Sequence, residues 1–266
     1  MHLPDQHSAV LDRIRTAVSG DERFVGLAAG GSLVTGGMDE HSDLDLVVVV
    51  SDEHQGAVMQ RRHEIARGWG DLLAAFTGEH VGEPRLLVCL YADPLMHVDL
   101  KFVTVDELVP RIEDPVVIWE RGSAVSRQLA ATGPTPLAID PQWMEDRFWT
   151  WVHYAATKLA RGELFEVLDF LAFLRGRVIA PLAMHVRGLP PRGARRLEEH
   201  APELVEPLAR TAVSHDAREC ADAVTRCVDL YRSLRDQLPD PLRRNAAAEG
   251  AALAHLRDST GGGASR

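Results

Sequence analysis

The sequence predicts an α/β fold in two parts: an N-terminal domain with a small mixed β-sheet flanked by helices, and a C-terminal all-α helical bundle. Short β-branched and alternating apolar runs, which are typical of strands, fall in the first half of the 266 residues. Long stretches with helical spacing dominate the second half, and a proline-rich stretch separates the two. These three observations together predict the fold class.

The first part is expected to span residues 1–130. Val10, Ile14 and Val18 repeat at helical spacing and predict a first helix. Apolar residues within 58–76 step by three or four positions, which predicts one long amphipathic helix. Apolar runs predict strands at 24–29, 43–50, 85–91, 96–103 and 116–120.

A linker is expected at 131–141, where glycine and several prolines stiffen the chain. It separates the first part from a helical domain at 142–258, which the glycine-containing residues 259–266 follow as a disordered tail. Apolar periodicity predicts helices at 142–161, 163–187, 203–213, 216–237 and 241–257.

The charge balance argues against a long nucleic acid as the main partner. The formal net charge is −10, whereas proteins that bind nucleic-acid backbones present a basic surface. An acidic surface suits a small cationic acceptor. Apolar runs such as 46–50 are too short to span a membrane, and we expect a cytoplasmic protein with reduced cysteines. The sequence leaves the oligomeric state open.

The predicted strand at 43–50 begins with two aspartates at alternate positions. Because successive side chains of a strand alternate between faces, Asp43 and Asp45 are expected to point the same way. Their apolar neighbours exclude water, and the repulsion between two carboxylates favours a cation between them. Oxygen-only ligands suit Mg²⁺. The alternative is a pair of solvated aspartates at the mouth of the strand.

A glycine turn directly follows the preceding strand. Glycine lets the backbone turn sharply and approach a ligand closely, which fits the position of Gly31. Ser32 is expected to open a short helical turn whose free N–H groups can hold phosphate. Each feature alone is common, but a strand, a Gly-Ser turn, ten residues and an Asp-x-Asp strand form a specific arrangement.

This arrangement, Gly31-Ser32-x10-Asp43-x-Asp45, resembles the signature of the nucleotidyltransferase superfamily that includes DNA polymerase β. The resemblance implies a third carboxylate on a neighbouring strand, and Asp99 provides it. It also implies that Asp43 and Asp45 bridge two Mg²⁺ ions, with Asp99 on the catalytic one. Ser32 would then bind the terminal phosphates of a nucleoside triphosphate, expected to be ATP.

Two basic residues flank the third aspartate in its strand. His97 and Lys101 fall on the same face as Asp99, because each lies two positions away. From this strand phase we expect Lys101 to contact a phosphate. We expect His97 to be a packed, neutral histidine rather than a metal ligand.

The second part resembles the helical domain of aminoglycoside adenylyltransferases, on residues 148–159 and 161–165. Within that family the second part resembles streptomycin 6-adenylyltransferases, and less closely lincosamide and kanamycin enzymes. Related enzymes place a lysine from this domain on the nucleotide phosphates, and Lys158 matches that role. The alternative is that Lys158 belongs to a solvated basic stripe on one helix face.

Other polar and aromatic residues of the second part leave alternatives open. The tryptophans Trp143, Trp149 and Trp151 are expected in the core, although they could also wall an acceptor site. Candidates for a general base are Glu163, Asp146, Glu166 and His153.

The function implied by the resemblance is transfer of a nucleoside monophosphate, expected to be AMP, to a hydroxyl of a small molecule, with release of pyrophosphate. An aminoglycoside- or lincosamide-like acceptor would make the protein antibiotic-resistance-like. Three aspartates and a triphosphate are all negative, so metal charge is needed between them. Two alternatives remain: an AMPylating enzyme of toxin–antitoxin type that modifies a protein, and a non-catalytic nucleotide-binding module.

Overall fold

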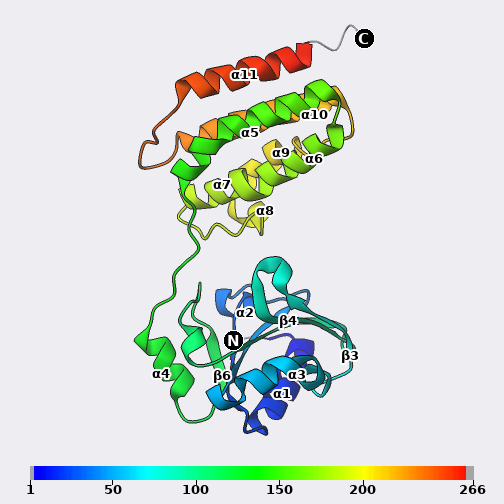
Figure 1. Cartoon of the computed structure of the whole chain (residues 1–266), viewed down its shortest axis with the longest axis vertical. Helices are drawn as coiled ribbons and strands as arrows, with labels where there is room; N and C mark the ends of the chain where they lie inside the picture. Colours follow the sequence, from blue (N-terminus) through cyan, green and yellow to red (C-terminus); the bar gives the residue numbers. More distant parts are fainter. Residues whose placement is uncertain (1–2, 262–266) are drawn as a thin grey trace. The chain divides into compact units, whose positions relative to one another are not determined.

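The structure is a computed structural model and describes residues 3–261. The chain forms two compact units, Met1–Pro136 and Leu137–Arg266. Each unit has its own hydrophobic core. Figure 1 shows the strands in the first unit and the helices α5 to α11 in the second.

The first unit is built on a six-stranded sheet with the order β3-β4-β5-β2-β1-β6. The central strands β2 and β5 pair in parallel, whereas the other neighbours pair antiparallel. The sheet is therefore mixed, and the predicted α/β class is confirmed for this unit. Its strands are β1 Phe24–Ala29, β2 Leu44–Val50, β3 Leu72–Gly78, β4 Glu83–Tyr91, β5 Met96–Val103 and β6 Val116–Glu120.

Two helices cover one face of the sheet. The helices α1 (Asp5–Ser19) and α3 (Gln55–Arg67) pack their buried apolar residues against inward-facing side chains of the strands (Figure 1). Trp69 ties this layer to the sheet, because its ring lies 5.8 Å from Phe24 and 6.1 Å from Phe102. Burial of such apolar area is the main stabilising contribution to the unit.

The opposite face of the sheet is covered only in part. A small apolar cluster that includes Val49, Val103 and Val125 lies there, and Val125 belongs to α4 (Ala124–Ala131). On the same face of β5, His97 is exposed and Asp99 and Lys101 are half-buried, so the surface beside this part of β5 is accessible. The short elements of the unit are α2 Ser32–Thr35, η1 Asp52–His54, η2 Glu79–Val81 and η3 Asp106–Leu108.

The predicted single helix over 58–76 is wrong. The helix α3 ends at Arg67, and residues from Leu72 onward form β3, an edge strand that pairs with β4. The chain turns at Gly70, where a Cβ would lie 3.1 Å from the Tyr91 ring and 2.8 Å from Arg13. An apolar spacing of four residues fits a strand face as well as a helix face, so the spacing from Leu72 to Phe76 was ambiguous.

The second unit contains helices and connecting loops within its described residues. Its longest helix, α5, starts where the Asp140 carboxylate accepts hydrogen bonds from the backbone N–H groups of Gln142 and Trp143. It ends at Gly162, whose φ of 71° favours glycine. The elements are α5 Pro141–Arg161, α6 Leu164–Phe173, η4 Leu174–Ile179, α7 Ala180–Val186, α8 Leu197–His200, α9 Pro202–Ala209, α10 Ala217–Arg235 and α11 Ala246–Gly261.

A buried polar cluster lies in the core of the second unit. The Glu145 side chain is 1% exposed and accepts a hydrogen bond of 2.6 Å from the Tyr231 hydroxyl. Its carboxylate also pairs with Arg235 at 3.2 Å. Tyr231 stacks on Phe148 at 3.7 Å between ring centroids, so the charge is enclosed by aromatic rings.

Within residues 3–261, no helix combines the length and apolar character needed to cross a bilayer.

Two helix predictions in the second unit need correction. The predicted helix over 163–187 is divided by a π-helical segment, η4, which directly precedes the helix that contains Pro181. Proline lacks the N–H that a regular turn needs, and a wider turn accommodates it. The last helix begins at Ala246 rather than 241 and continues to Gly261. Residues 259–261 are therefore helical rather than part of the predicted disordered tail, and 262–266 lie outside the described residues.

Candidate active site

The parallel pairing of β2 with β5 places two of the predicted carboxylates side by side. Asp45 is the direct partner of Asp99 in the register of the two strands. Their neighbours Leu44, Leu46 and Val98 are buried, whereas both aspartates are half-buried on the accessible face of the sheet. In a parallel pair, residues opposite each other project from the same face. The backbone register therefore brings these carboxylates together although they lie far apart in the sequence.

The third predicted carboxylate, Asp43, lies one residue before β2 and is also half-buried. Among the described residues, no three His, Cys, Asp or Glu side chains are already gathered as a metal ligand set. The Asp99 carboxylate instead pairs with the imidazole of His97, at 2.8 Å between Oδ1 and Nε2. The residues therefore fit a hard divalent cation in donor type and strand register. The His97 contact uses Oδ1 of Asp99, so a cation would bind through Oδ2 or in place of His97.

The glycine turn between β1 and α2 contacts the carboxylate of Asp45. Gly31 has φ 60° and ψ −134°, and a Cβ on it would lie 1.7 Å from Oδ2 of Asp45. Only glycine can adopt this conformation and this close approach. The N–H of Gly30 donates to the backbone carbonyl of Asp45 at 2.8 Å, which fixes the turn to the start of β2. The turn and the aspartate strand thus form one rigid corner.

The side chain of Ser32 already has a hydrogen-bond partner. Its Oγ donates a hydrogen bond to Sδ of Met38 at 3.1 Å. A sulfur acceptor is weak, so a phosphate oxygen would be a stronger partner for this hydroxyl. The predicted phosphate contact therefore needs a rotation of the Ser32 side chain.

A fourth carboxylate lies at the turn, and the sequence analysis missed it. Oε1 of Glu113 accepts a hydrogen bond of 2.8 Å from the backbone N–H of Gly31. Glu113 lies 82 positions further along the chain, in the loop between η3 and β6. No spacing or motif connects a loop glutamate with a distant glycine turn, so the sequence carries no signal for this contact.

The basic residues beside Asp99 have partners of their own. The Nζ of Lys101 pairs with Glu83 at 2.8 Å. The guanidinium of Arg85, and then Lys101, lower the pKa of Glu83 from 4.5 to about 2. The side chain of His97 is 48% exposed, so the prediction of a packed histidine is wrong. It lies on the accessible sheet face, where nothing from α1 or α3 can cover it.

In the second unit, the predicted lysine and one predicted base are partners of each other. The Nζ of Lys158 pairs with the carboxylate of Glu163. This hydrogen bond lowers the pKa of Glu163, and a lower pKa makes a weaker base. The neighbouring Glu166 accepts a hydrogen bond of 2.7 Å from the Tyr154 hydroxyl. Asp146 accepts one of 2.7 Å from the Gln142 amide.

The tryptophans of α5 divide between core and surface. Trp149 is 3% exposed, and its Nε1 donates to Glu145, as a core residue should. Trp143 is 47% exposed, with the guanidinium of Arg147 at 4.1 Å from its ring centroid. The core prediction is therefore confirmed for Trp149 and wrong for Trp143, which lies in the first turn of its helix.

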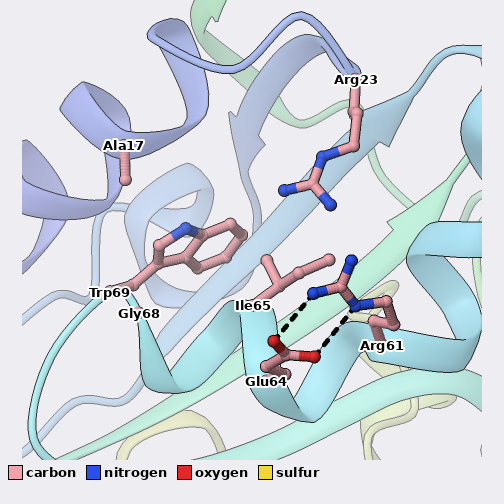
Figure 2. Close-up of a pocket in the computed structure, with 7 residues that line it drawn as sticks. All are labelled: Ala17, Arg23, Arg61, Glu64, Ile65, Gly68 and Trp69. Atoms are coloured by element: carbon pink, nitrogen blue, oxygen red, sulfur yellow. Dashed lines mark hydrogen bonds and ion pairs between the residues drawn. The ribbon is translucent and has the colours of Figure 1, made fainter.

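A separate pocket lies between α1, β1 and α3 (Figure 2). It has a volume of about 320 Å³ and is lined by Ala17, Arg23, Arg61, Glu64, Ile65, Gly68 and Trp69. The guanidinium groups of Arg23 and Arg61 face this space, and Arg61 is held by Glu64. None of the predicted site residues lines this pocket, so it is not part of the aspartate site.

Comparisons with known proteins bear on the first unit. Residues 11–83 match the family model of the nucleotidyltransferase domain. This stretch contains the glycine turn and the Asp-x-Asp strand, and it ends before Asp99. No curated protein sequence matches the chain.

Solved structures similar to the chain include an aminoglycoside 6-adenyltransferase from Bacillus subtilis, at 14% identity and a TM-score of 0.39, covering 94% of this chain and 97% of that one. A nucleotidyltransferase-like protein from Exiguobacterium sibiricum has 14% identity and a TM-score of 0.38, covering 96% and 88%. A spectinomycin adenyltransferase from Enterococcus faecialis, determined with ATP and spectinomycin, has 11% identity and a TM-score of 0.28, covering 96% and 99%. TM-scores below 0.5 do not establish a shared overall fold.

Proposed function

The chain is a nucleotidyltransferase with its nucleotidyltransferase domain in the first unit, and from this premise we propose the reaction that its residues support. The protein transfers a nucleoside monophosphate, AMP from ATP, to a hydroxyl of a small molecule and releases pyrophosphate. The reaction depends on Mg²⁺ held by Asp43, Asp45 and Asp99. The observation that carries this proposal is the direct pairing of Asp45 with Asp99, beside a glycine turn that contacts the Asp45 carboxylate.

The three aspartates have a definite role in this proposal. They would hold two divalent cations. The spacing of Asp45 and Asp99 is set by the backbone register of β2 and β5. When bound, Mg²⁺ supplies positive charge that neutralises the triphosphate and lowers the pKa of the acceptor hydroxyl. The buried neighbours of the two aspartates keep water from one side of the site, which strengthens the electrostatic interactions there.

Phosphate binding falls to the glycine turn in this proposal. The backbone N–H of Gly31 points at an anion already, since it donates to the Glu113 carboxylate. Ser32 adds a hydroxyl that leaves Met38 for a phosphate oxygen. Lys101 and Lys158 contact phosphate after exchanging Glu83 and Glu163 for it. Because a triphosphate carries more negative charge than a single carboxylate, each exchange favours nucleotide binding.

The acceptor is proposed to be a small, cationic, hydroxyl-bearing molecule of the aminoglycoside or lincosamide kind. The net charge of −10 favours a cationic acceptor over a polyanion. Residues 142–258 are proposed as the acceptor-binding domain, after a linker at 131–141, and residues 1–130 as the catalytic domain. Asp146 remains a proposed general base alongside Glu163, whose pairing with Lys158 weakens it in the described state.

A two-stage experiment tests this function. Thermal shift with each of four nucleoside triphosphates and Mg²⁺ identifies the nucleotide, because a ligand at a hundred times its Kd stabilises by about 2.7 kcal/mol. Pyrophosphate release is then measured with aminoglycosides, lincosamides and small sugars, and mass spectrometry of the acceptor must show the added nucleoside monophosphate. Triphosphate binding without pyrophosphate release across the acceptor panel contradicts the proposal. An added mass on a co-purified protein instead would identify a protein-modifying enzyme.

A further inference from the structure

The carboxylate of Glu113 occupies a position in which the proposed function places a phosphate. Its Oε1 accepts the hydrogen of the Gly31 N–H at 2.8 Å. The same oxygen also lies near Gly30, since a Cβ on Gly30 would be 3.7 Å from it. That Cβ would also be 4.0 Å from the Asp45 Cβ. Glu113 therefore lies at the same corner as Asp45, on the turn that would grip the nucleotide.

A backbone N–H is a single donor. While the Gly31 N–H donates to Glu113, it cannot donate with full strength to a phosphate oxygen. A carboxylate oxygen and a phosphate oxygen make the same kind of charge-assisted hydrogen bond, so they compete for this donor. The negative charge of Glu113 would also repel a triphosphate at this short range.

The backbone on either side of Glu113 is anchored, so a response to nucleotide falls to its side chain. The Arg111 side chain is 8% exposed and donates to Thr132 Oγ1 at 2.7 Å and to the Leu129 carbonyl at 3.0 Å. The Arg111 carbonyl accepts from the N–H of Thr135 at 2.8 Å. On the other side, β6 begins at Val116 and pairs with β1. Displacing the carboxylate from Gly31 therefore calls for rotation about its side-chain torsions rather than movement of the loop.

We propose that Glu113 is an internal competitor of the triphosphate, a positioning residue that occupies the Gly31 amide in the free protein and swings away when nucleotide binds. By occupying this amide, it raises the nucleotide concentration at which half of the protein is bound. This inference rests on the proposed function, because it requires that triphosphate binds at Gly31.

Two variants separate charge from hydrogen bonding. In Glu113→Ala the competitor is absent, and the Kd for ATP with Mg²⁺ should fall about tenfold, the scale of a hydrogen bond to a charged group. In Glu113→Gln the amide oxygen still accepts from Gly31 but carries no charge, and the Kd should fall by about threefold, as for a neutral hydrogen bond. Isothermal titration calorimetry measures both, and the Kd for adenosine should change in neither.

The matched control is Asp114→Asn, which removes the same charge one residue away. The Asp114 carboxylate is 57% exposed and pairs with Arg111, not with the glycine turn. Its Kd for ATP should change by less than about twofold, since exposed charges are screened. In the turnover assay, the KM for ATP of Glu113→Ala should fall with its Kd while kcat stays within about threefold of wild type.

The outcomes distinguish this inference from the proposed function. If wild type binds ATP but both Glu113 variants bind it equally or more weakly, the competitor role is overturned and the proposed function stands. A hundredfold loss of kcat in Glu113→Gln would also overturn it, because Glu113 would then act on the reacting groups. If wild type binds no triphosphate at all, the proposed function fails and this inference fails with it.

Discussion

The two units of the molecule position their predicted site residues in different ways. In the first unit, the backbone register of β2 and β5 places Asp45 opposite Asp99. In the second, Lys158 and Glu163 belong to helical surfaces and their turn, and the two pair with each other. The hydrogen-bonded register of two strands fixes the distance between paired residues. A long side chain on a helix surface can instead reach several partners through different rotamers. Position in a sheet is therefore the stronger evidence for a role.

The largest expected effect comes from removing one charge of the Asp45–Asp99 pair. Replacing Asp45 by Asn removes a cation-binding charge but keeps the shape of the side chain, so transfer should fall by at least about 10³-fold while the fold persists. Pyrophosphate release and circular dichroism measure the two properties. The control is Asp52→Asn, an exposed residue just beyond the end of the same strand, whose turnover should match wild type. Normal turnover by Asp45→Asn would exclude this site.

The next effect concerns stability in the second unit. Replacing Glu145 by Ala removes the buried partner of Tyr231 and Arg235, and should lower the free energy of unfolding by about 3 kcal/mol. Glu198→Ala, an exposed change on α8, should alter it by less than about 0.5 kcal/mol. Urea unfolding followed by tryptophan fluorescence measures both. Equal unfolding midpoints would show that the buried pair does not stabilise the unit.

The third effect follows from the lowered pKa of Glu83. The folded pKa of about 2 lies below the unfolded value of 4.5, so the pairing with Arg85 and Lys101 contributes fully above pH 4.5. This contribution is lost as the pH falls from 4.5 toward about 2. With allowance for partial solvent exposure, we expect about 2 kcal/mol. Glu83→Gln should flatten the dependence of unfolding free energy on pH in this window, and an unchanged slope would refute the pairing.

The smallest expected effect tests whether a helix residue of the second unit, Lys158, contributes to nucleotide binding. Lys158→Met should raise the KM for the triphosphate by up to about tenfold, with little change in kcat, if the lysine exchanges Glu163 for phosphate. Arg161→Met serves as the control, because Arg161 also approaches Glu163 but is more exposed. A KM that is equal in Lys158→Met and wild type would leave Lys158 as a structural partner of Glu163 alone.

Much of the first unit followed from residue pattern. The strand at 24–29 was predicted with its observed bounds, and the strand at 96–103 likewise. The edge strand β3 was missed because its apolar spacing also fits a helix, and nothing in the local sequence shows that Gly70 must pack against Tyr91. Buried strands are specified by their own β-branched residues, but an edge strand depends on the partner that it meets.

The candidate site was predicted less completely than the fold. The sequence predicted Gly31 and the three aspartates as site residues from their types and spacing, and the structure places Asp45 beside Asp99 and Gly31. The sequence could not locate the partners that surround them: Glu113 at the Gly31 amide, Glu83 at Lys101 and His97 at Asp99. These contacts depend on the final direction of flexible side chains, which neither period nor propensity encodes.

The parallel pairing of β2 with β5 has a consequence for how the protein acquires activity. The chain between these strands contains α3, β3 and β4, so β5 reaches β2 only across a long connection. Closing such a long loop is entropically unfavourable and slow compared with hairpin formation. A partly folded chain can therefore contain every helix and hairpin of the unit and still hold its two central aspartates apart. The proposed site forms only when this pairing forms, so mutations in β3 or β4 that hinder it can impair activity without touching the site.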